Sequence, residues 1–363
     1  MTSPVSSAPG RAIPVERTGA SRLAGTDLAQ VAFSSAFSDH MLYAEFRDGA
    51  WQEAALRPYG PLPLAPSASV IQYGVSVFEG LKAQRMPDGA VALFRPRENA
   101  LRLNRSTRRM AMPDVPEELF LGGLRQLLRL DEGWVPPAGA GALYIRPCLF
   151  SIDESVRVKP AERFAFVIFT FPFSAYYSAP LDVLVSTRYV RAFPGGTGDV
   201  KPAGNYAPTL IAELEARAAD FATVLWLDGV ERRYVEECGV MNVFFVLDEG
   251  GTRVVTPELG GTILPGVTRD SAIVLLRDLG IDVDQRRVAM DEIAEHHRAG
   301  RLRECFGTGT AATLTHIRRI RYDERDLVLP PIEECTVGPA VRDRLVAIAG
   351  GRAPDPHAWV ERV

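Results

Sequence analysis

Lysine is scarce in this chain of 363 residues. Of its 41 basic residues, 38 are arginines and only Lys82, Lys159 and Lys201 are lysines. Arginine is effectively always protonated, so it supplies a positive charge but cannot supply a neutral primary amine. Because this chain uses arginine almost wherever it needs a basic charge, each remaining lysine is a candidate for amine chemistry.

Three further features that the sequence lacks exclude broad classes of protein. The net charge of -4 argues against nucleic-acid binding as the main function. The longest apolar run, residues 164–173, is half the length needed to cross a bilayer, so we expect no transmembrane helix. The N-terminal sequence MTSPVSSAPGR lacks the basic-then-apolar pattern of a secretory signal, so we expect none.

Cysteine is also rare, and no two of the four cysteines form a CxxC pair. A zinc knuckle or a dithiol redox motif is therefore not supported. Scattered cysteines in a chain of this size favour reduced thiols and a cytoplasmic location. The neighbouring His296 and His297 lack the i,i+4 spacing of a zinc pair on one helix face, so no metal site is predicted.

The length and the apolar content of 47% are typical of a globular protein with two domains. Residues 1–26 are rich in Ser, Pro, Ala and Gly and are predicted to form a flexible arm. A smaller N-terminal α/β domain is expected at 27–172, a linker at 173–181 and a larger C-terminal domain at 182–363. Strands and helices are mixed irregularly, which predicts the α+β class.

Hydrophobic periodicity gives the individual elements. Strands are predicted at 40–46, 91–94, 142–150, 163–171, 182–186, 224–227, 241–247 and 253–256, and helices at 98–110, 119–130, 207–221, 267–280 and 339–349.

Lys201 lies in a Gly-rich loop, PGGTGDVKPAGNY, between a predicted strand and a predicted helix. A partly buried amine there would lose its proton near neutral pH and could form an imine with a carbonyl cofactor. A solvated loop lysine is the alternative interpretation.

Two segments are typical of anion sites. Residues 266–271 open a helix, whose free N–H groups and dipole suit a phosphate, although Thr268 and Ser271 could instead cap it. The loop GTGT at 307–310 could wrap an anion with its N–H groups, or be a simple tight turn. Two phosphate signals beside a candidate imine lysine favour pyridoxal 5'-phosphate as the cofactor.

Glu236 and Glu237 form a third candidate feature, because a carboxylate facing the pyridine nitrogen would keep that nitrogen protonated. In an extended strand the two side chains point to opposite faces, so only one could do so. Two solvated carboxylates are the alternative. In the predicted strand at 142–150, Tyr144 and Arg146 point the same way and could hold a substrate carboxylate, or Arg146 could form an ordinary ion pair.

Eight segments together closely resemble the branched-chain amino acid aminotransferases. They are SDHM at 38–41, QYGVSVFEGLKA at 72–83, FRPRENALRL at 94–103, YIRP at 144–147, KPAGNY at 201–206, ECGVMN at 237–242, ILPGVTR at 263–269 and FGTGTA at 306–311. The combination is far more specific than any single piece. The resemblance implies a two-domain, fold-type IV pyridoxal-phosphate enzyme, a homodimer whose active site lies between the domains and whose C-terminal domain binds the cofactor.

The resemblance also implies roles for single residues. In the family, the lysine matching Lys201 carries the cofactor, and the glutamate matching Glu237 pairs with its ring nitrogen, which leaves Glu236 as a bystander. The remaining cofactor contacts are implied for Arg102, Tyr206, Val267, Thr268 and Thr310. Substrate contacts are implied for Phe33, Tyr73, Phe78, Tyr144, Arg146, Ala311 and Ala312, with Arg146 shaping the site for glutamate or its oxo acid.

The expected reaction moves an amino group reversibly from L-leucine, L-isoleucine or L-valine to 2-oxoglutarate in two half-reactions. D-amino acid aminotransferases and aminodeoxychorismate lyases share the lysine and the glutamate and remain alternatives within the fold. A non-catalytic cofactor-binding or interaction protein is an alternative of another class. The segment at 311–315 reads AATLT, so the CxxC that some relatives carry there is missing.

Overall fold

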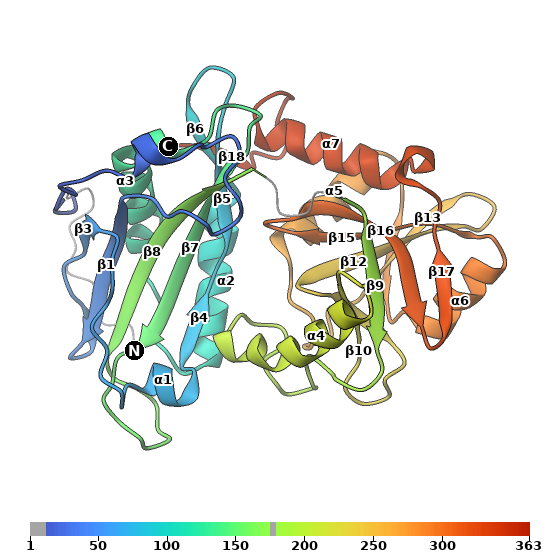
Figure 1. Cartoon of the computed structure of the whole chain (residues 1–363), viewed down its shortest axis with the longest axis horizontal. Coiled ribbons are helices and arrows are strands. Elements are labelled where there is room, and N and C mark those ends of the chain that lie inside the picture. The colour runs from blue at the N-terminus through green and yellow to red at the C-terminus, as the bar shows by residue number, and fades with distance from the viewer. Residues whose placement is uncertain (1–11, 175–178) are drawn as a thin grey trace. The chain divides into compact units, whose positions relative to one another are not determined.

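The structure of the chain is a computed structural model, and it describes residues 12–174 and 179–363. The chain forms two compact units (Figure 1). Unit 1 contains residues 1–176, Lys201–Gly204 and Ile348–Val363, whereas unit 2 contains residues 177–200 and 205–347. Sequence analysis placed the last segment in the second domain. It belongs to unit 1 because its strand β18 pairs with β6.

A mixed arrangement of long and short strands forms the sheet of unit 1, in the order β18-β6-β5-β7-β8-β1-β2, with β3 paired to β1 and β4 to β7. The strands are β1 (His40–Arg47), β2 (Ala50–Trp51), β3 (Ala55–Pro58), β4 (Ser76–Phe78), β5 (Leu81–Arg85), β6 (Val91–Phe94), β7 (Ala142–Ser151), β8 (Phe164–Phe173) and β18 (Val360–Arg362). The central pair β7 and β8 is antiparallel, with Tyr144 opposite Phe171.

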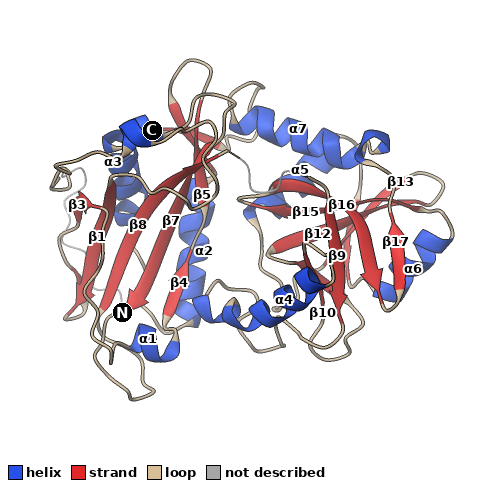
Figure 2. Cartoon of the chain, viewed as in Figure 1, coloured by secondary structure: helices blue, strands red, loops and turns tan. Residues whose placement is uncertain are grey.

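Helices cover one face of this sheet (Figure 2). They are α2 (Pro96–Arg109) and α3 (Gly123–Leu130), the latter preceded by a π-helical turn at Glu118–Gly122, whereas the short helix α1 (Ser69–Tyr73) precedes β4. Leu103 of α2 and Leu127 of α3 join Leu143 and Ile145 of β7 in the core. Because strand residues alternate between faces, Tyr144 lies on the opposite face, which carries the site described below.

Unit 2 is built on a second sheet in which β11-β10-β9-β16-β15-β12-β13-β14 follow one another. A further pairing of β11 with β12 closes the first six of these strands into a ring, and β17 pairs with β16. The strands are β9 (Leu181–Ser186), β10 (Thr223–Leu227), β11 (Val235–Cys238), β12 (Met241–Asp248), β13 (Thr252–Pro257), β14 (Val283–Arg286), β15 (Leu302–Gly309), β16 (Thr313–Tyr322) and β17 (Arg325–Val328). The helices are α4 (Leu210–Ala218), α5 (Val267–Asp278), α6 (Met290–Arg298) and α7 (Val337–Ala349).

The α+β class is confirmed, and each predicted helix and strand overlaps an observed one. Two local expectations were wrong. Residues 307–309 belong to strand β15 rather than to a loop, because β12 and β16 pair with them on both sides. The predicted arm is tied to unit 1 from residue 12 onward, since Val15 bridges to Leu56 and Ile13 packs against the core.

Residues 1–11 of the predicted arm and residues 175–178 of the predicted linker lie outside the described residues. Within the described ranges, the structure contains no helix with both the length and the apolar content needed to span a membrane.

Candidate active site

Lys201 is fixed to unit 1 by its backbone. Its N–H donates to Ser106 Oγ at 3.0 Å, and its carbonyl accepts from the N–H of Phe78 at 3.1 Å. The next residue, Pro202, forms a bridge with Val77 of β4. Lys201 is therefore held between α2 and β4, and it is not the solvated loop lysine that sequence analysis kept as an alternative.

The Lys201 amine is near an aromatic ring and a carboxylate that forms an ion pair with an arginine. Nζ lies 4.7 Å from the centroid of the Phe78 ring. Glu79 is fully buried and bonds Arg102, with Oε1 2.7 Å from Nε and Oε2 2.9 Å from Nη2. Burial acts to raise the pKa of Glu79, but Arg102, and after it Lys201 and Asn99, outweigh burial and lower that pKa below its usual value. Arg102 thus lies near the lysine, paired with Glu79.

An aromatic wall stands on the same face of the unit 1 sheet. Tyr144 stacks on Phe171 with ring centroids 5.0 Å apart, and the edge-on ring of Phe33 lies 5.1 Å from that of Tyr144. Phe173 contacts the same rings. The structure thus brings Phe33 and Tyr144 together, although they are far apart in sequence.

Arg146 joins this wall as the strand pattern predicted. Its guanidinium lies 5.5 Å from the Tyr144 centroid and 4.7 Å from the Phe78 centroid. Its Nε is buried and has no hydrogen-bond partner, and none of the described carboxylates forms an ion pair with it. The ordinary ion pair considered as an alternative is therefore not what holds Arg146, which remains available to a ligand carboxylate.

Tyr73 is placed differently from the other predicted substrate residues. It ends α1, its side chain is 45% exposed, and its phenol donates to the carbonyl of Val156. That contact ties it to the loop after β7 rather than to the aromatic wall. Its substrate contact therefore stays a proposal.

Gly80 controls the position of the Tyr144 phenol. A Cβ atom at position 80 would lie 2.9 Å from Tyr144 Cζ and closer still to its hydroxyl oxygen. If L-leucine is a substrate, as the resemblance implies, we expect Gly80→Ala to displace the ring and to raise the KM for L-leucine about tenfold, with a smaller effect on kcat. Steady-state kinetics check this, with Gly60→Ala as the control because a Cβ there meets nothing within 4 Å. An unchanged KM would remove Tyr144 from the substrate pocket.

Lys82 of β5 lies opposite Tyr144 of β7 in the register. Burial lowers the pKa of Lys82 to about 8, from its usual value of 10.5. Between these pH values the unfolded chain binds a proton that the folded chain does not, so this group favours the folded state more as the pH rises. Below pH 8 the buried amine of Lys82 is protonated, so the folded state carries the full free-energy cost of burying that charge.

Lys82→Met is therefore expected to raise the free energy of unfolding near neutral pH, by about 1–3 kcal/mol. Urea unfolding of both proteins measures this, first near neutral pH and then at stepwise higher pH. The advantage of the variant should shrink as the pH approaches the usual lysine pKa. A difference that does not depend on pH would contradict the assignment.

In unit 2, Glu237 is held by one hydrogen bond and one ion pair. Its Oε1 accepts from the N–H of Leu264 at 2.7 Å and lies 3.4 Å from Nη2 of Arg191. Arg191 is itself fixed by the carbonyls of Gly198 and Thr262. Glu237 and the Arg191 side chain are both buried. Oε1 of Glu237 therefore already has its partners, and the positive charge of Arg191 lies beside the Glu237 carboxylate.

Glu236 faces the other side of β11, as expected for an extended pair. Burial raises the pKa of Glu236, an effect that Thr262 and the charge of Arg191 oppose. The exposed fractions of Glu236 and Glu237 are 5% and 4%. The alternative of two solvated carboxylates was therefore wrong, because strand β11 is covered on both faces.

The start of α5 meets the requirements of a phosphate site. Gly266 is the N-cap, and no side chain caps the helix, since the Ser271 hydroxyl turns back to the Val267 carbonyl. A Cβ on Gly266 would collide with Asn242, so only glycine leaves room there. The N–H groups at Val267 and Thr268 therefore lie at a helix terminus that no side chain caps, as an anion requires.

The remaining predicted residues of unit 2 lie in two turns. Thr310, Ala311 and Ala312 form the turn between β15 and β16 and are half-buried. Tyr206 precedes the short helix Ala207–Thr209, and Asn205 beside it bonds the carbonyls of Thr197 and Val200, which fixes the Gly-rich loop. Next to the first turn, Thr308 Oγ1 is buried without a hydrogen-bond partner.

Comparison with known proteins decides the family. The model of the family described as "Amino-transferase class IV" matches residues 76–320. A branched-chain-amino-acid aminotransferase of Mycobacterium tuberculosis (strain ATCC 25618 / H37Rv) is 44% identical over 342 residues, which are 93% of this chain and 93% of that protein. The chain belongs to the class IV aminotransferases.

Solved structures of similar proteins agree with this class IV aminotransferase in fold. The T.th. branched-chain amino acid aminotransferase complexed with N-(5'-phosphopyridoxyl)-L-glutamate has a TM-score of 0.70 and 25% identity, covering 88% of this chain and 97% of that one. The same enzyme complexed with 4-methylvaleric acid has a TM-score of 0.69 and 26% identity, with the same coverage.

The candidate functional residues of this aminotransferase thus form two groups, each described within its own unit. Unit 1 holds Lys201 with Phe78, Arg102 and the aromatic wall, and unit 2 holds Glu237 with the α5 terminus and the 310–312 turn. Sequence reasoning missed Glu79 and Arg191, the ionic partners of Arg102 and Glu237. No local pattern marks either, because each partner lies far along the chain.

Proposed function

We propose that this class IV aminotransferase moves the amino group of L-leucine, L-isoleucine or L-valine to 2-oxoglutarate with pyridoxal 5'-phosphate as cofactor. The observation that carries the proposal is similarity over nearly the whole length, 44% identity, to an enzyme named for this activity. The two sets of residues described above supply the groups that the reaction needs.

The residues fit the cofactor. The uncapped start of α5 suits its phosphate, through the backbone of Val267 and Thr268. Thr310 and Arg102 add a hydroxyl and a guanidinium, Tyr206 adds a phenol for the phenolic oxygen, and Glu237 keeps its second oxygen for the ring nitrogen. When bound, the cofactor supplies a carbonyl carbon for the lysine and a protonated ring that accepts electrons.

Lys201 then has two tasks. Its amine would hold the cofactor, and once an incoming amino acid displaced it, Nζ would take the proton from the substrate Cα as a base and give it back as an acid. The backbone bonds to Ser106 and Phe78 fix the point on unit 1 from which this side chain extends. Glu237, with Arg191 beside it, keeps the ring nitrogen protonated.

Two unlike side chains must use one pocket. The wall of Phe33, Tyr144 and Phe171 suits a branched aliphatic group and keeps water out, whereas Arg146 suits the second carboxylate of glutamate. The backbone N–H groups of Ala311 and Ala312 are the proposed partners of the α-carboxylate. The T.th. enzyme was solved with both a glutamate adduct and 4-methylvaleric acid, which supports this double use.

The absorbance spectrum of the purified protein, before and after adding L-leucine without an acceptor, tests the proposal. The band of the lysine-bound cofactor should be replaced by that of the pyridoxamine form, and 2-oxoglutarate should restore it. A protein that responds to D-leucine alone would be a D-amino acid aminotransferase. A bound cofactor that ignores both would favour a lyase, and no cofactor band would favour a non-catalytic scaffold.

We also propose that the chain works as a cytoplasmic homodimer. The four cysteines are free, which suits a reducing compartment. Large apolar side chains remain exposed on both units, Val156 and Val158 in unit 1 and Leu210 and Leu214 on α4 of unit 2. Such side chains in one chain suit burial against a second copy. Light scattering after gel filtration should give twice the mass of one chain, and a monomeric mass at micromolar concentration would reject the dimer.

A further inference from the structure

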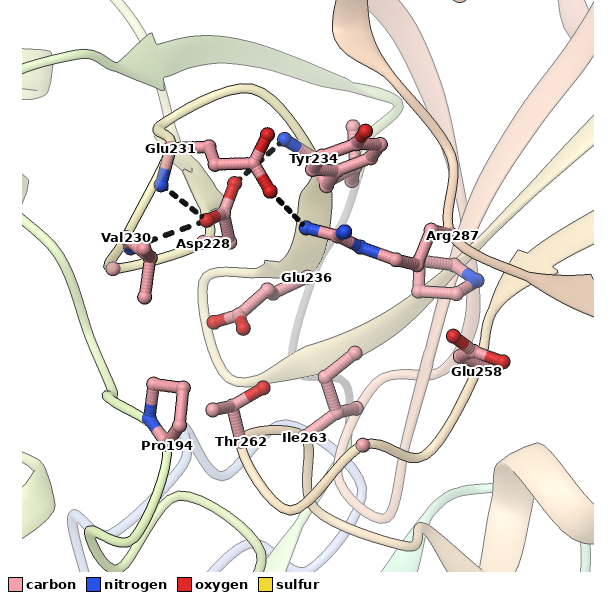
Figure 3. A pocket seen from close by; sticks show the side chains of 14 residues that line it. Pro194, Asp228, Val230, Glu231, Tyr234, Glu236, Glu258, Thr262, Ile263 and Arg287 are labelled. Atoms are coloured by element: carbon pink, nitrogen blue, oxygen red, sulfur yellow. Dashed lines mark hydrogen bonds and ion pairs between the residues drawn. The ribbon is translucent and has the colours of Figure 1, made fainter.

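Polar side chains outside the site serve different purposes in the two units. At the pocket of unit 2 (Figure 3), Asp228 accepts four backbone N–H groups of residues 230–234, and Arg287 lies 2.8 Å from a carboxylate oxygen of Glu231. These contacts hold the turn after β10 in place without a ligand. In unit 1, the polar segment SDHM at 38–41 instead bonds a stretch of chain that leads to the aromatic wall.

The first three residues of the SDHM segment are buried. The exposed fractions of Ser38, Asp39 and His40 are 0%, 6% and 5%. A buried polar side chain is costly unless it is hydrogen-bonded, so the partners of these three show what the segment does. Two of the three, Asp39 and His40, bond residues 18–22, which we call the N-terminal strap.

His40 bonds the strap through its imidazole ring. Its Nε2 accepts the backbone N–H of Thr18 at 3.0 Å. Its Nδ1 lies 2.6 Å from Oδ1 of Asp131, whose Oδ2 accepts the His40 backbone N–H at 2.8 Å. A carboxylate only accepts hydrogen bonds, so Nδ1 carries the proton and Nε2 keeps its lone pair for Thr18. Asp131 thus sets the tautomer that the strap needs.

Asp39 holds the other end of the strap. Its Oδ1 accepts the backbone N–H of Arg22 at 3.0 Å, and its Oδ2 accepts the Ser21 hydroxyl at 2.5 Å. Trp134 donates its Nε1–H to the same Oδ2 at 3.1 Å. The Arg22 guanidinium in turn donates to the Ser38 carbonyl at 2.6 Å. The strap is therefore fixed at both of its ends to the chain that begins β1.

The loop 23–37 follows the strap and brings Phe33 to the aromatic wall. The ring of Phe33 lies edge-on to that of Phe171, with centroids 4.9 Å apart. Ser38, directly after the loop, donates its backbone N–H to the Thr170 carbonyl of β8 at 2.9 Å. The loop is thus anchored by the strap before its first residue and by β8 after its last.

The backbone beside Phe33 is strained. Ser34 has a φ of 63°, in the left-handed region that residues other than glycine adopt rarely. Such a conformation persists only where the surrounding contacts hold it. Ser174 supplies a nearby contact by donating its N–H to the Val31 carbonyl at 3.1 Å. The anchors at the two ends of the loop supply the rest, so losing one of them should let Phe33 move.

Side chains give the strap a second connection to the wall. The Arg22 guanidinium lies 5.5 Å from the ring centroid of Tyr59, and Tyr59 stacks on Phe37 with centroids 4.9 Å apart. Phe37 contacts Phe171 edge-on, with centroids 5.7 Å apart. The strap therefore reaches the wall through packed rings as well as through the backbone.

We propose that His40 is a positioning residue for the substrate pocket. By accepting the Thr18 N–H it fixes the strap, and the strap holds Phe33 against the ring of Tyr144. The identity of the substrate rests on the proposed function, whereas the placement of Phe33 does not. Loss of the His40 contact should raise the KM for L-leucine and change kcat little, because the groups assigned to the chemistry are not altered.

Two variants of His40 test the contact in the cofactor-loaded enzyme. The amide of His40→Asn reaches the place of Nδ1 and still donates to Asp131, but leaves Thr18 without its acceptor. The amide of His40→Gln reaches the place of Nε2 and restores that acceptor, but leaves Asp131 without its side-chain donor. We expect His40→Asn to raise the KM about tenfold with kcat within about twofold, and His40→Gln to keep the KM within about threefold.

Urea unfolding should rank the same two variants in the opposite order. His40→Gln should be the less stable, because the buried Asp131 carboxylate loses a hydrogen bond. A KM that rises in both variants in proportion to the lost stability would overturn the positioning role. The matched control is His297→Asn on α6 of unit 2, where the ring contacts the Val328 carbonyl. Its KM should stay within about twofold of the original.

Thr18→Pro removes the same hydrogen bond from the other side, because proline has no N–H. Its KM should rise as much as that of His40→Asn. The double variant should show no further rise, since the two changes delete one shared contact. Additive effects would show that His40 does not act through the strap.

Hydrogen–deuterium exchange of peptides from the loop 23–37 gives a readout that does not depend on activity. Exchange should be at least about threefold faster in His40→Asn and Thr18→Pro, and unchanged in His297→Asn. Unchanged exchange in the first two variants, or faster exchange with an unchanged KM, would overturn the proposal. If the original protein had no turnover with L-leucine, the proposed function would fail, and the exchange alone would decide whether the strap holds the loop.

Discussion

Lys201→Ala is expected to reduce turnover with L-leucine by at least about 10³-fold, because the proposed mechanism uses this one amine for both cofactor attachment and proton transfer. The absorbance band of the lysine-bound cofactor should disappear as well. The fold should persist, since the backbone bonds of Lys201 to Ser106 and Phe78 do not involve the side chain. Stopped-flow absorbance and steady-state rates measure both effects.

The matched control is Lys159→Ala. Lys159 is one of the two other lysines, and its amine lies 3.2 Å from Glu162 at the surface of unit 1. Turnover of this variant should stay within about twofold of the original, since an exposed ion pair contributes little. If Lys201→Ala kept the rate of this control, the assignment of the reactive amine would be lost.

Glu237→Gln is expected to lower kcat about 100-fold, the value of a charged hydrogen bond of about 3 kcal/mol. The amide can still accept the Leu264 N–H, so the loss comes from the missing negative charge beside the cofactor ring nitrogen. Arg191 is then left buried without its carboxylate, which should also lower the free energy of unfolding by about 3 kcal/mol. Rates and urea unfolding report the two losses separately.

Two further variants test whether these losses come from removing any negative charge or from removing the one at position 237. Glu295→Gln removes an equal charge from the surface and should leave both quantities close to their original values. Restoring neutrality by combining Glu237→Gln with Arg191→Met should recover part of the stability but none of the rate. Recovery of the rate would show that the carboxylate serves the fold rather than the ring nitrogen.

Much of the fold follows from local patterns in the chain. Strand β8 was predictable because a nearly unbroken apolar run of this length suits a strand buried on both faces. Helix α2 was predictable from its apolar spacing and from Pro96 at its first turn, where a missing N–H is harmless. Both signals are contained within a few neighbouring residues.

Strand β16 was missed because its stabilising contacts are distant. It carries Arg318, Arg319 and Arg321, which read as a solvated segment until Asp182 of β9 and Asp326 of β17 are seen to pair with them. Strand β18, with three residues at the end of the chain, has no pattern of its own and exists only through its pairing with β6. Tertiary contact overrides local propensity in both cases.

The candidate site divides in the same way. Lys201 was found because a lysine is conspicuous in a chain that otherwise uses arginine. Arg191 was not found for the same reason, because it is one arginine among 38, although it forms an ion pair with Glu237. Composition marks a residue only when its chemistry is rare in that chain.

The interleaving of the two units has a consequence for dissecting this enzyme. The chain leaves unit 2 for the four residues Lys201–Gly204 and ends in unit 1 with Ile348–Val363. A gene cut near residue 180 would therefore give a first fragment that lacks both its edge strand and Lys201, and a second fragment that carries this lysine without the sheet that fixes it. Neither half is a self-sufficient module, so the two units should have been inherited, and should melt, as a single piece.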